Sequence, residues 1–261
     1  MASAPQSVSM PLFYNDLVPL NSGEHGSWSM RGTDKAKWLS KAHAIPMTVE
    51  EFPLAQRNFP IVFSGGNDPV PLALMGLNDG VNVFVDDEGT VTSPIYMPAY
   101  ARRYPFMLAK LRPDTDELSL CFDPTTDLLG EFEDGQALFD GKEPSQACKN
   151  ALKFCEQFEV AGQKTAQFVQ ELKKHDLLME GELKIDLDQT DKPFIYRGFQ
   201  MVDENKLREL RGDVLRAWNQ NGMLPLIFAH LFSLDHVREI FARQVQLGKG
   251  PVEMLQAAGQ A

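Results

Sequence analysis

The sequence predicts an α+β fold, with an antiparallel β-rich N-terminal half and a helical C-terminal half packed on it. Between residues 59 and 122, short apolar runs alternate with turn signals every eight to twelve residues, which is typical of an antiparallel meander. From residue 145 onward, apolar residues recur in steps of three and four, the period of a helix. Because no long flexible linker separates the halves, we expect one domain over 10–248, β-rich over 10–135 and mainly helical over 140–248, between tails 1–9 and 249–261.

The first part of the β-rich half holds weaker signals. We expect a short strand in 11–20, a loop over 21–32 and weak helical character in 33–43. Thr48 is the predicted N-cap of a short helix, because Glu51 stands three residues later, as in a capping box. Pro53 predicts that this helix ends early.

The strands of the meander are expected where apolar runs lie between turns rich in Gly, Asn and Asp. Most of these runs are almost continuously apolar, so we expect the sheet to be covered on both faces in places. The predicted strands are 59–63, 70–77, 81–85, 106–111 and 118–122.

The helical half opens with the clearest helix, predicted over 145–175 with Ser145 as its N-cap. Its apolar or small residues are Cys148, Leu152, Cys155, Phe158, Gly162, Thr165, Phe168, Val169 and Leu172. A hairpin of 182–187 and 194–202 should follow. Asp203 is the predicted cap of a helix that continues through Trp218, and Ser233 the predicted cap of the last helix, which ends near Gly248.

Composition limits the classes of partner. The chain has 25 basic and 36 acidic residues, a formal net charge of -11 and a pI near 4.9. Such a surface repels phosphate backbones, so we expect no nucleic-acid partner. Hydrophobic residues make up 43% of the chain, which is enough to fill a core.

Cysteines and apolar runs indicate the compartment. Cys121, Cys148 and Cys155 form no CxxC pair, so we interpret all three as reduced core thiols, which favours a reducing compartment. The N-terminus lacks the features of a signal peptide. The longest apolar run, 223–232, is far shorter than the roughly twenty residues of a membrane span. We therefore expect a soluble cytoplasmic protein without a membrane span, and leave open surface association by a route that uses no cleaved signal.

Residues 94–106, which we name the Arg-Tyr segment, are the most distinctive stretch. No acidic residue occurs between 89 and 113, although the chain is acidic overall. Pro98 and Pro105 limit any helix here to a turn or two, and such stiff turns suit a preorganised surface. The residues that could bind a partner or an anion are Tyr96, Tyr100, Arg102, Arg103 and Tyr104. Alternatively, the arginines pair with the acidic stretch 114–143 and the tyrosines pack beneath them.

Two histidines complete the candidate site, His43 and His230. Ser233 and Asp235 follow His230 and invite a catalytic-triad interpretation, but the chain contains no GxSxG motif, and a satisfied core histidine explains His230 better. No HExxH, EF-hand or phosphate-loop pattern is present, so we expect no metal site and no cofactor. The acids at 86–88 and at 186, 188 and 191 are interpreted as solvated turns.

The order of these features resembles the bacterial SapC family over roughly residues 11–245. The matching segments are 43–47, 51–52, 59–63, 76–77, 82–85, 96–106, 135–140, 198–207 and 229–234, of which 96–106 is the most specific. The resemblance implies an association with a surface layer and supplies no catalytic residues. It also implies, by gene neighbourhood, an accessory role beside halogenase-like or cupin-like enzymes and outer-membrane receptors. Relatives are often described as peptide transporter permeases, which disagrees with a chain that lacks a membrane span.

Three functions therefore stay open. The first is a soluble, non-catalytic binding or accessory protein that uses the Arg-Tyr segment to hold an anionic group, a peptide or a protein partner, in a pathway of peptide or natural-product modification or uptake. The second is an enzyme of unknown reaction, with His43 or His230 beside Arg102 or Arg103. The third is a structural component of a surface layer.

Overall fold

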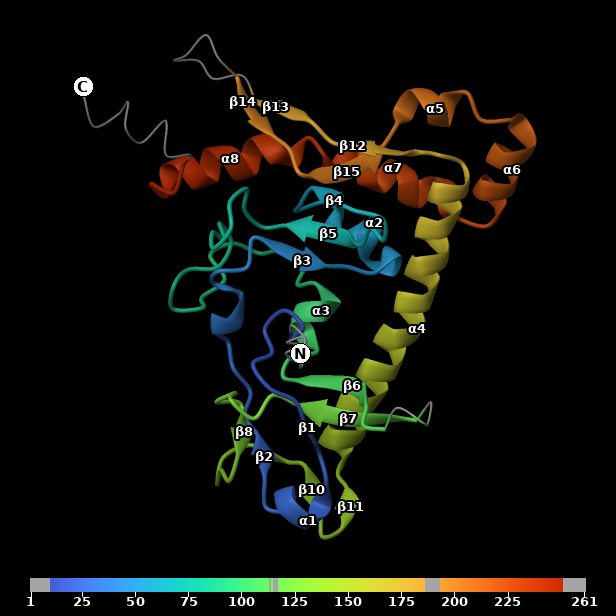
Figure 1. Ribbon diagram of the computed structural model, residues 1–261. Coiled ribbons are helices and arrows are strands. Elements are labelled where there is room, and N and C mark those ends of the chain that lie inside the picture. The colour runs from blue at the N-terminus through green and yellow to red at the C-terminus, as the bar shows by residue number, and fades with distance from the viewer. Residues whose placement is uncertain (1–9, 113, 115–116, 186–192, 251–261) are drawn as a thin grey trace, which may run out of the picture. The chain divides into compact units, whose positions relative to one another are not determined.

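The computed structural model describes residues 10–112, 114, 117–185 and 193–250 and confirms the α+β class (Figure 1). Antiparallel strands dominate the N-terminal half, and helices gather toward the C-terminus. The chain forms two compact units, each built from two stretches: residues 1–34 with 103–157, and residues 35–102 with 158–261. The prediction of a single domain over 10–248 stays a prediction.

The first unit holds two small antiparallel sheets and a hairpin. One sheet has the order β1-β7-β6, with β1 at Val18–Pro19, β6 at Phe106–Lys110 and β7 at Leu118–Phe122. The second has the order β8-β2-β9, and β10 pairs with β11. Their bounds are β2 Ser29–Met30, β8 Leu129–Gly130, β9 Gln136–Ala137, β10 Phe139–Asp140 and β11 Glu143–Pro144. The short helix α1 (Ser22–His25) also belongs to this unit.

The core of the first unit explains why β6 and β7 pair. Phe106 and Phe122 face each other in the register and are both buried in one apolar cluster. The other buried members of this cluster are Leu108, Leu129, Leu138, Phe139 and Cys155. The predicted strands 106–111 and 118–122 are confirmed, whereas 21–32 contains α1 and β2 in addition to loop.

The second unit is built on a five-stranded antiparallel sheet of order β12-β15-β4-β5-β3. Its strands are β3 Ala44–Pro46, β4 Ile61–Ser64, β5 Pro71–Leu74, β12 Leu178–Glu180 and β15 Phe199–Val202. The strands predicted at 59–63 and 70–77 correspond to β4 and β5, and β13 (Leu183–Ile185) and β14 (Phe194–Tyr196) form a separate hairpin. Residues 186–192 of the predicted hairpin lie outside the described residues.

Helices and single turns surround this sheet. The long helix α4 runs over Gln146–Lys174, within one residue of the predicted bounds, and its residues from 158 onward belong to the second unit. The short turns are η1 (Lys37–Leu39), η2 (Val49–Glu51), α2 (Phe52–Ala55) and α3 (Ala99–Arg102). The C-terminal helices are α5 (Glu204–Arg208), α6 (Gly212–Gln220), α7 (Met223–Ser233) and α8 (His236–Gln246).

Four predicted elements are wrong. The strand predicted over 194–202 is two strands, because β14 pairs with β13 whereas β15 pairs with β12 and β4 in the five-stranded sheet. Residues 81–85 form no strand, because the Asn82 side chain replaces ladder bonds by donating to the carbonyls of Leu39 and Ala42 and accepting from two following backbone N–H groups. The helix capped by Asp203 ends at Arg208, and α6 starts anew. Ser233 does not cap the last helix: it ends α7, and its hydroxyl accepts a hydrogen bond from the N–H of Ile61 over 2.8 Å.

The cysteines match the expectation of reduced core thiols. All three are buried and make no disulfide. Burial raises the pKa of Cys121 and of Cys148, which keeps these thiols protonated and unreactive. Within the described part of the chain, no helix is both long enough and apolar enough to span a bilayer.

Candidate functional site

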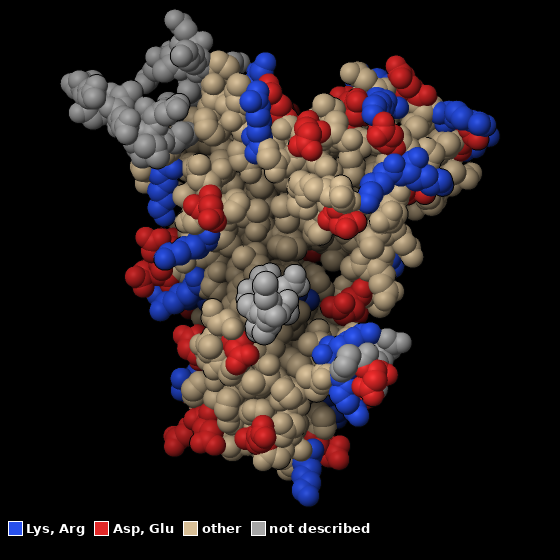
Figure 2. Space-filling view, viewed as in Figure 1, with Lys and Arg blue, Asp and Glu red and all other residues tan. Residues whose placement is uncertain are grey.

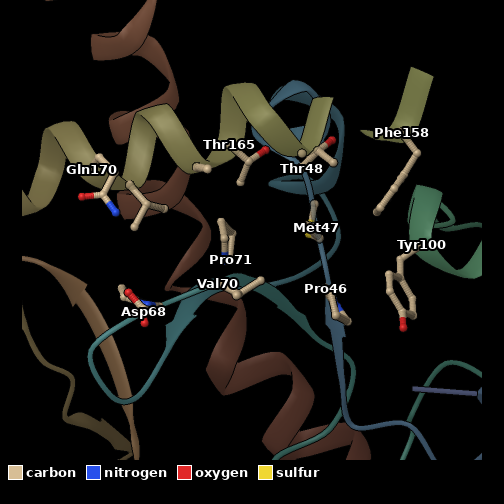
Figure 3. Close-up of a pocket in the computed structure, with 14 residues that line it drawn as sticks. Pro46, Met47, Thr48, Asp68, Val70, Pro71, Tyr100, Phe158, Thr165 and Gln170 are labelled. Carbon is tan, nitrogen blue, oxygen red and sulfur yellow. The ribbon is translucent and has the colours of Figure 1, made fainter. Parts of the chain in front are cut away.

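The second unit contains a groove beside α4, which we name the α4 groove. It has a volume of about 430 Å³, and α4 forms one side while β3, β5 and the turn before β5 form the other (Figure 3). Most of its lining is apolar. The lining residues are Pro46, Met47, Thr48, Asp68, Pro69, Val70, Pro71, Tyr100, Phe158, Gly162, Thr165, Ala166, Val169 and Gln170.

The α4 side of the groove consists of one helical face, because its residues recur at steps of three and four. Gly162 stands at the middle of this face. A Cβ atom built on Gly162 would have no heavy atom within 4 Å, so a larger side chain there would enter open space. Glycine in a helix interior costs roughly 0.5–1 kcal/mol relative to alanine. Gly162 thus makes the helix less stable, but it leaves the groove wider than a larger side chain would.

The aromatic end of the groove is formed by Tyr100 and Phe158. Their ring centroids are 6.1 Å apart with an interplanar angle of 65°, an edge-to-face contact. Tyr100 lies on the single turn α3, which the Arg-Tyr segment places next to β3. Tyr100 is therefore the one residue of the predicted site that lines this groove.

A buried carboxylate holds the Arg-Tyr segment in place. Oε1 of Glu51 accepts hydrogen bonds from the Tyr96 hydroxyl over 3.0 Å and from the Ala99 N–H over 2.6 Å. Oε2 accepts from the N–H and the hydroxyl of Thr48 over 2.8 and 2.9 Å. The predicted capping box of Thr48 and Glu51 is confirmed, and the same carboxylate also fixes the start of α3.

Thr165 fixes the opposite side. Its hydroxyl donates to the carbonyl of Ala161 over 2.7 Å and accepts from the N–H of Val49 over 3.0 Å. These bonds tie α4 to η2 in the second unit. Since both sides of the groove are held by buried hydrogen bonds, the groove is preformed rather than dependent on a ligand.

Arg102 lies at the exposed edge of the Arg-Tyr segment. Its Nη2 donates to the Tyr96 hydroxyl over 3.2 Å, and its guanidinium carbon lies 5.7 Å from the centre of the Tyr96 ring. Burial and the neighbouring Glu51 carboxylate raise the pKa of Tyr96 to about 12. Arg102 does not line the α4 groove.

Arg103 and Tyr104 belong to the first unit, because the division between the units falls after Arg102. Arg103 is buried, with its guanidinium carbon 6.0 Å from the centre of the Tyr14 ring. Tyr104 packs edge-to-face on Tyr14 at 5.4 Å, and burial raises its pKa.

The two candidate histidines differ in exposure. His230 is completely buried: its Nδ1 donates to the carbonyl of Ile61 over 2.7 Å, and its Nε2 accepts from the N–H of Val202 over 3.0 Å. Burial lowers its pKa to about 4, so the ring is neutral at physiological pH. His43 is half-buried, with Nδ1 3.4 Å from a carboxylate oxygen of Asp79.

The sequence predicted part of this groove. Tyr100 was a candidate site residue and Val169 belonged to the periodic face of the long helix, whereas Pro46 and Pro71 had no distinguishing pattern. Gly162 was the available signal, since an isolated glycine inside a strongly periodic helix marks a packing or functional constraint. Among the described residues, no three His, Cys, Asp or Glu side chains gather in a way that could hold a metal ion.

The fold and the groove define an α+β protein with a preformed, largely apolar groove beside one long helix. The SapC family model matches residues 20–240, so the chain belongs to the SapC family. No curated protein and no solved structure gives a significant match.

Proposed function

We propose that this SapC-family protein is a non-catalytic binding or accessory protein, and that the α4 groove is its binding site. The observation that carries the proposal is Gly162, which leaves open space on the face of α4 that lines the groove. Concave, largely apolar sites of this size are typical of ligand-binding sites. Tyr100 contributes its flat ring to the aromatic end.

An enzymatic function receives less support from the candidate residues. Both ring nitrogens of His230 are engaged inside the core, so this side chain is not positioned for proton transfer to a substrate. His43 does not line the α4 groove. Neither histidine is therefore placed for acid–base catalysis in the α4 groove.

The test is co-purification from an extract of the cells that make the protein. Wild type, Gly162→Leu and Gln163→Leu are each incubated with the extract and examined by native mass spectrometry. Gln163 is exposed, lies next to Gly162 and does not line the groove, so it is a matched control. We expect a species that wild type and Gln163→Leu retain and that Gly162→Leu loses. If Gly162→Leu folds normally and retains every species that wild type retains, the groove is not the binding site.

We also propose a cytoplasmic location, on the basis of the three buried thiols that form no disulfide. Cell fractionation tests this proposal against a role in a surface layer. Recovery in the cytosolic fraction alone supports it. Recovery in a surface-layer preparation would favour the structural role instead.

A further inference from the structure

The one charged side chain among the described residues that line the α4 groove is Asp68. This side chain is 94% exposed, with Oδ1 3.6 Å from Nζ of Lys173, so it lies at the solvent rim of the groove. Figure 2 shows acidic and basic side chains interspersed on the face in view, so the surface there does not concentrate ions of one sign. Since the described lining offers an ionised group no buried counter-charge for its lost hydration, the groove favours an uncharged ligand.

The two threonine hydroxyls of the lining donate within the protein. The hydroxyl of Thr48 donates to Oε2 of Glu51 over 2.9 Å. The hydroxyl of Thr165 donates to the carbonyl of Ala161 over 2.7 Å. A ligand acceptor that reached either hydroxyl would have to break a buried hydrogen bond, which is costly.

The strand side of the groove offers few backbone donors. Pro46, Pro69 and Pro71 carry no N–H group. The N–H of Met47 donates to the carbonyl of Pro71 over 2.9 Å, and the N–H of Val70 donates to the Ser64 hydroxyl over the same distance. A ligand rich in polar groups would lose hydrogen bonds to water there without replacing them, so the lining favours a largely apolar ligand.

The size of the groove matches one small molecule. Its volume of about 430 Å³ falls within the range of roughly 300–1,000 Å³ that is typical of small-molecule sites. The lining residues of α4 run from Phe158 to Gln170, which corresponds to about 18 Å along the helix axis.

The two ends of the groove differ in polarity. The rings of Tyr100 and Phe158 form one end, and Gln170 lies at the opposite end (Figure 3). Gln170 is exposed, and its side-chain amide can donate and accept hydrogen bonds. A polar group of the ligand at this end keeps its contact with water, whereas an apolar group packs against the two rings.

From these observations we propose that the α4 groove binds a small, uncharged and largely apolar molecule. Its apolar body lies over Gly162 and against the rings of Tyr100 and Phe158, and a polar uncharged group lies at the Gln170 end. The inference rests on the proposed function and deepens it by naming the class of ligand.

The experiment uses the full-length protein and the uncharged dye N-phenyl-1-naphthylamine, whose fluorescence increases in apolar surroundings. Titration gives the dissociation constant of the dye for wild type, Gly162→Leu and the control Gln163→Leu. Decanol, decanoate and decylammonium share one alkyl chain and differ in charge at neutral pH, and each then competes with the dye. Circular dichroism checks the fold of each variant. If Gly162→Leu does not fold, Ala166→Phe, one turn further along the same lining face, takes its place.

The proposal predicts that wild type binds the dye and that decanol displaces it at concentrations at least tenfold lower than decanoate or decylammonium do. The groove variant should weaken the binding of dye and decanol at least tenfold, and Gln163→Leu should leave it unchanged. The proposal is overturned if neither dye nor decanol binds, if a charged competitor displaces the dye as well as decanol does, or if the folded groove variant binds as wild type does.

The co-purification test separates this failure from that of the proposed function. A protein or a charged molecule retained from the extract in a Gly162-dependent way, together with a groove that binds neither dye nor decanol, would overturn the ligand class and leave the proposed binding function standing. Loss of the Gly162 dependence in both experiments would overturn both.

Discussion

The Tyr96 hydroxyl donates a hydrogen bond to the buried carboxylate of Glu51 over 3.0 Å. The same carboxylate accepts three further bonds, from the N–H of Ala99 and from the N–H and hydroxyl of Thr48. One acidic side chain thus both caps a turn and fixes the Arg-Tyr segment next to the α4 groove. This arrangement explains why a stretch without regular secondary structure, apart from a single turn, has a defined conformation.

Replacing Glu51 by glutamine should destabilise the protein by roughly 2–3 kcal/mol, because an amide NH₂ would face two buried donors. Urea unfolding monitored by circular dichroism measures the change. Glu50→Gln is the matched control: Glu50 is exposed and pairs with Lys164 on the surface, so the loss of its charge should cost less than about 1 kcal/mol. Equal effects of the two substitutions would contradict the anchoring role of Glu51.

Gly162→Ala should increase the free energy of unfolding by about 0.5–1 kcal/mol, because alanine favours the helix and its Cβ meets no atom within 4 Å. Gly76→Ala provides the contrast. A Cβ on Gly76 would lie 1.9 Å from the carbonyl oxygen of Val81, so this change should destabilise by about 1–3 kcal/mol or more. Urea titrations measure the free energy of unfolding of both variants. A destabilised Gly162→Ala would mean that the space above Gly162 is not open.

His230 should make stability depend on pH. Its pKa lies at about 4 in the folded protein and near 6.5 when unfolded, so the unfolded state binds more protons between these values. The contribution of the neutral ring is complete above pH 6.5 and is lost as the pH falls toward 4, by roughly 3 kcal/mol at most.

Unfolding free energies of wild type and His230→Gln at several pH values test this dependence. Other groups titrate in both proteins, so the difference between the two curves isolates His230. We expect the advantage of wild type to shrink as the pH falls from 6.5 to 4. A difference that stays constant over this range would show that His230 is not buried and neutral.

The Tyr96 hydroxyl should ionise at a higher pH than that of an ordinary tyrosine. Burial and Glu51 raise its pKa to about 12. The absorbance at 295 nm is measured against pH for wild type and for Tyr96→Phe, and the difference between the two curves reports Tyr96. This difference should appear near pH 12 rather than near pH 10. The unfolded chain loses this proton first, so the contribution of Tyr96 to stability should fall as the pH rises from 10 to 12. A missing absorbance change centred at pH 10 would contradict the contact with Glu51.

Sequence patterns predicted the elements whose stability is local. The helix α4 follows from its apolar period, and β4, β6 and β7 follow from apolar runs between turns. The capping box at Thr48 was also visible, because its partners are three residues apart. In each case the signal that predicts the element lies in residues that are close together along the chain.

The errors arose where distant residues decide the structure. Asn82 binds carbonyls some forty residues earlier in the chain, at positions 39 and 42, and Ser233 binds the N–H of Ile61 at a separation of 172 residues. No pattern of neighbouring residues in the sequence predicts such bonds. For the same reason the groove was only partly predictable: Tyr100 belongs to a conspicuous segment, whereas Pro46, Pro71 and Val169 meet only in the fold.

The most direct test of the central claim is protection of a single thiol placed in the α4 groove. Ala166 is exposed and lines the groove, and the native cysteines are buried, so a maleimide should label Ala166→Cys selectively. We predict that an extract of the native cells slows this labelling several-fold relative to Gln163→Cys in the same extract. Equal slowing of the two variants would contradict a binding function for the groove.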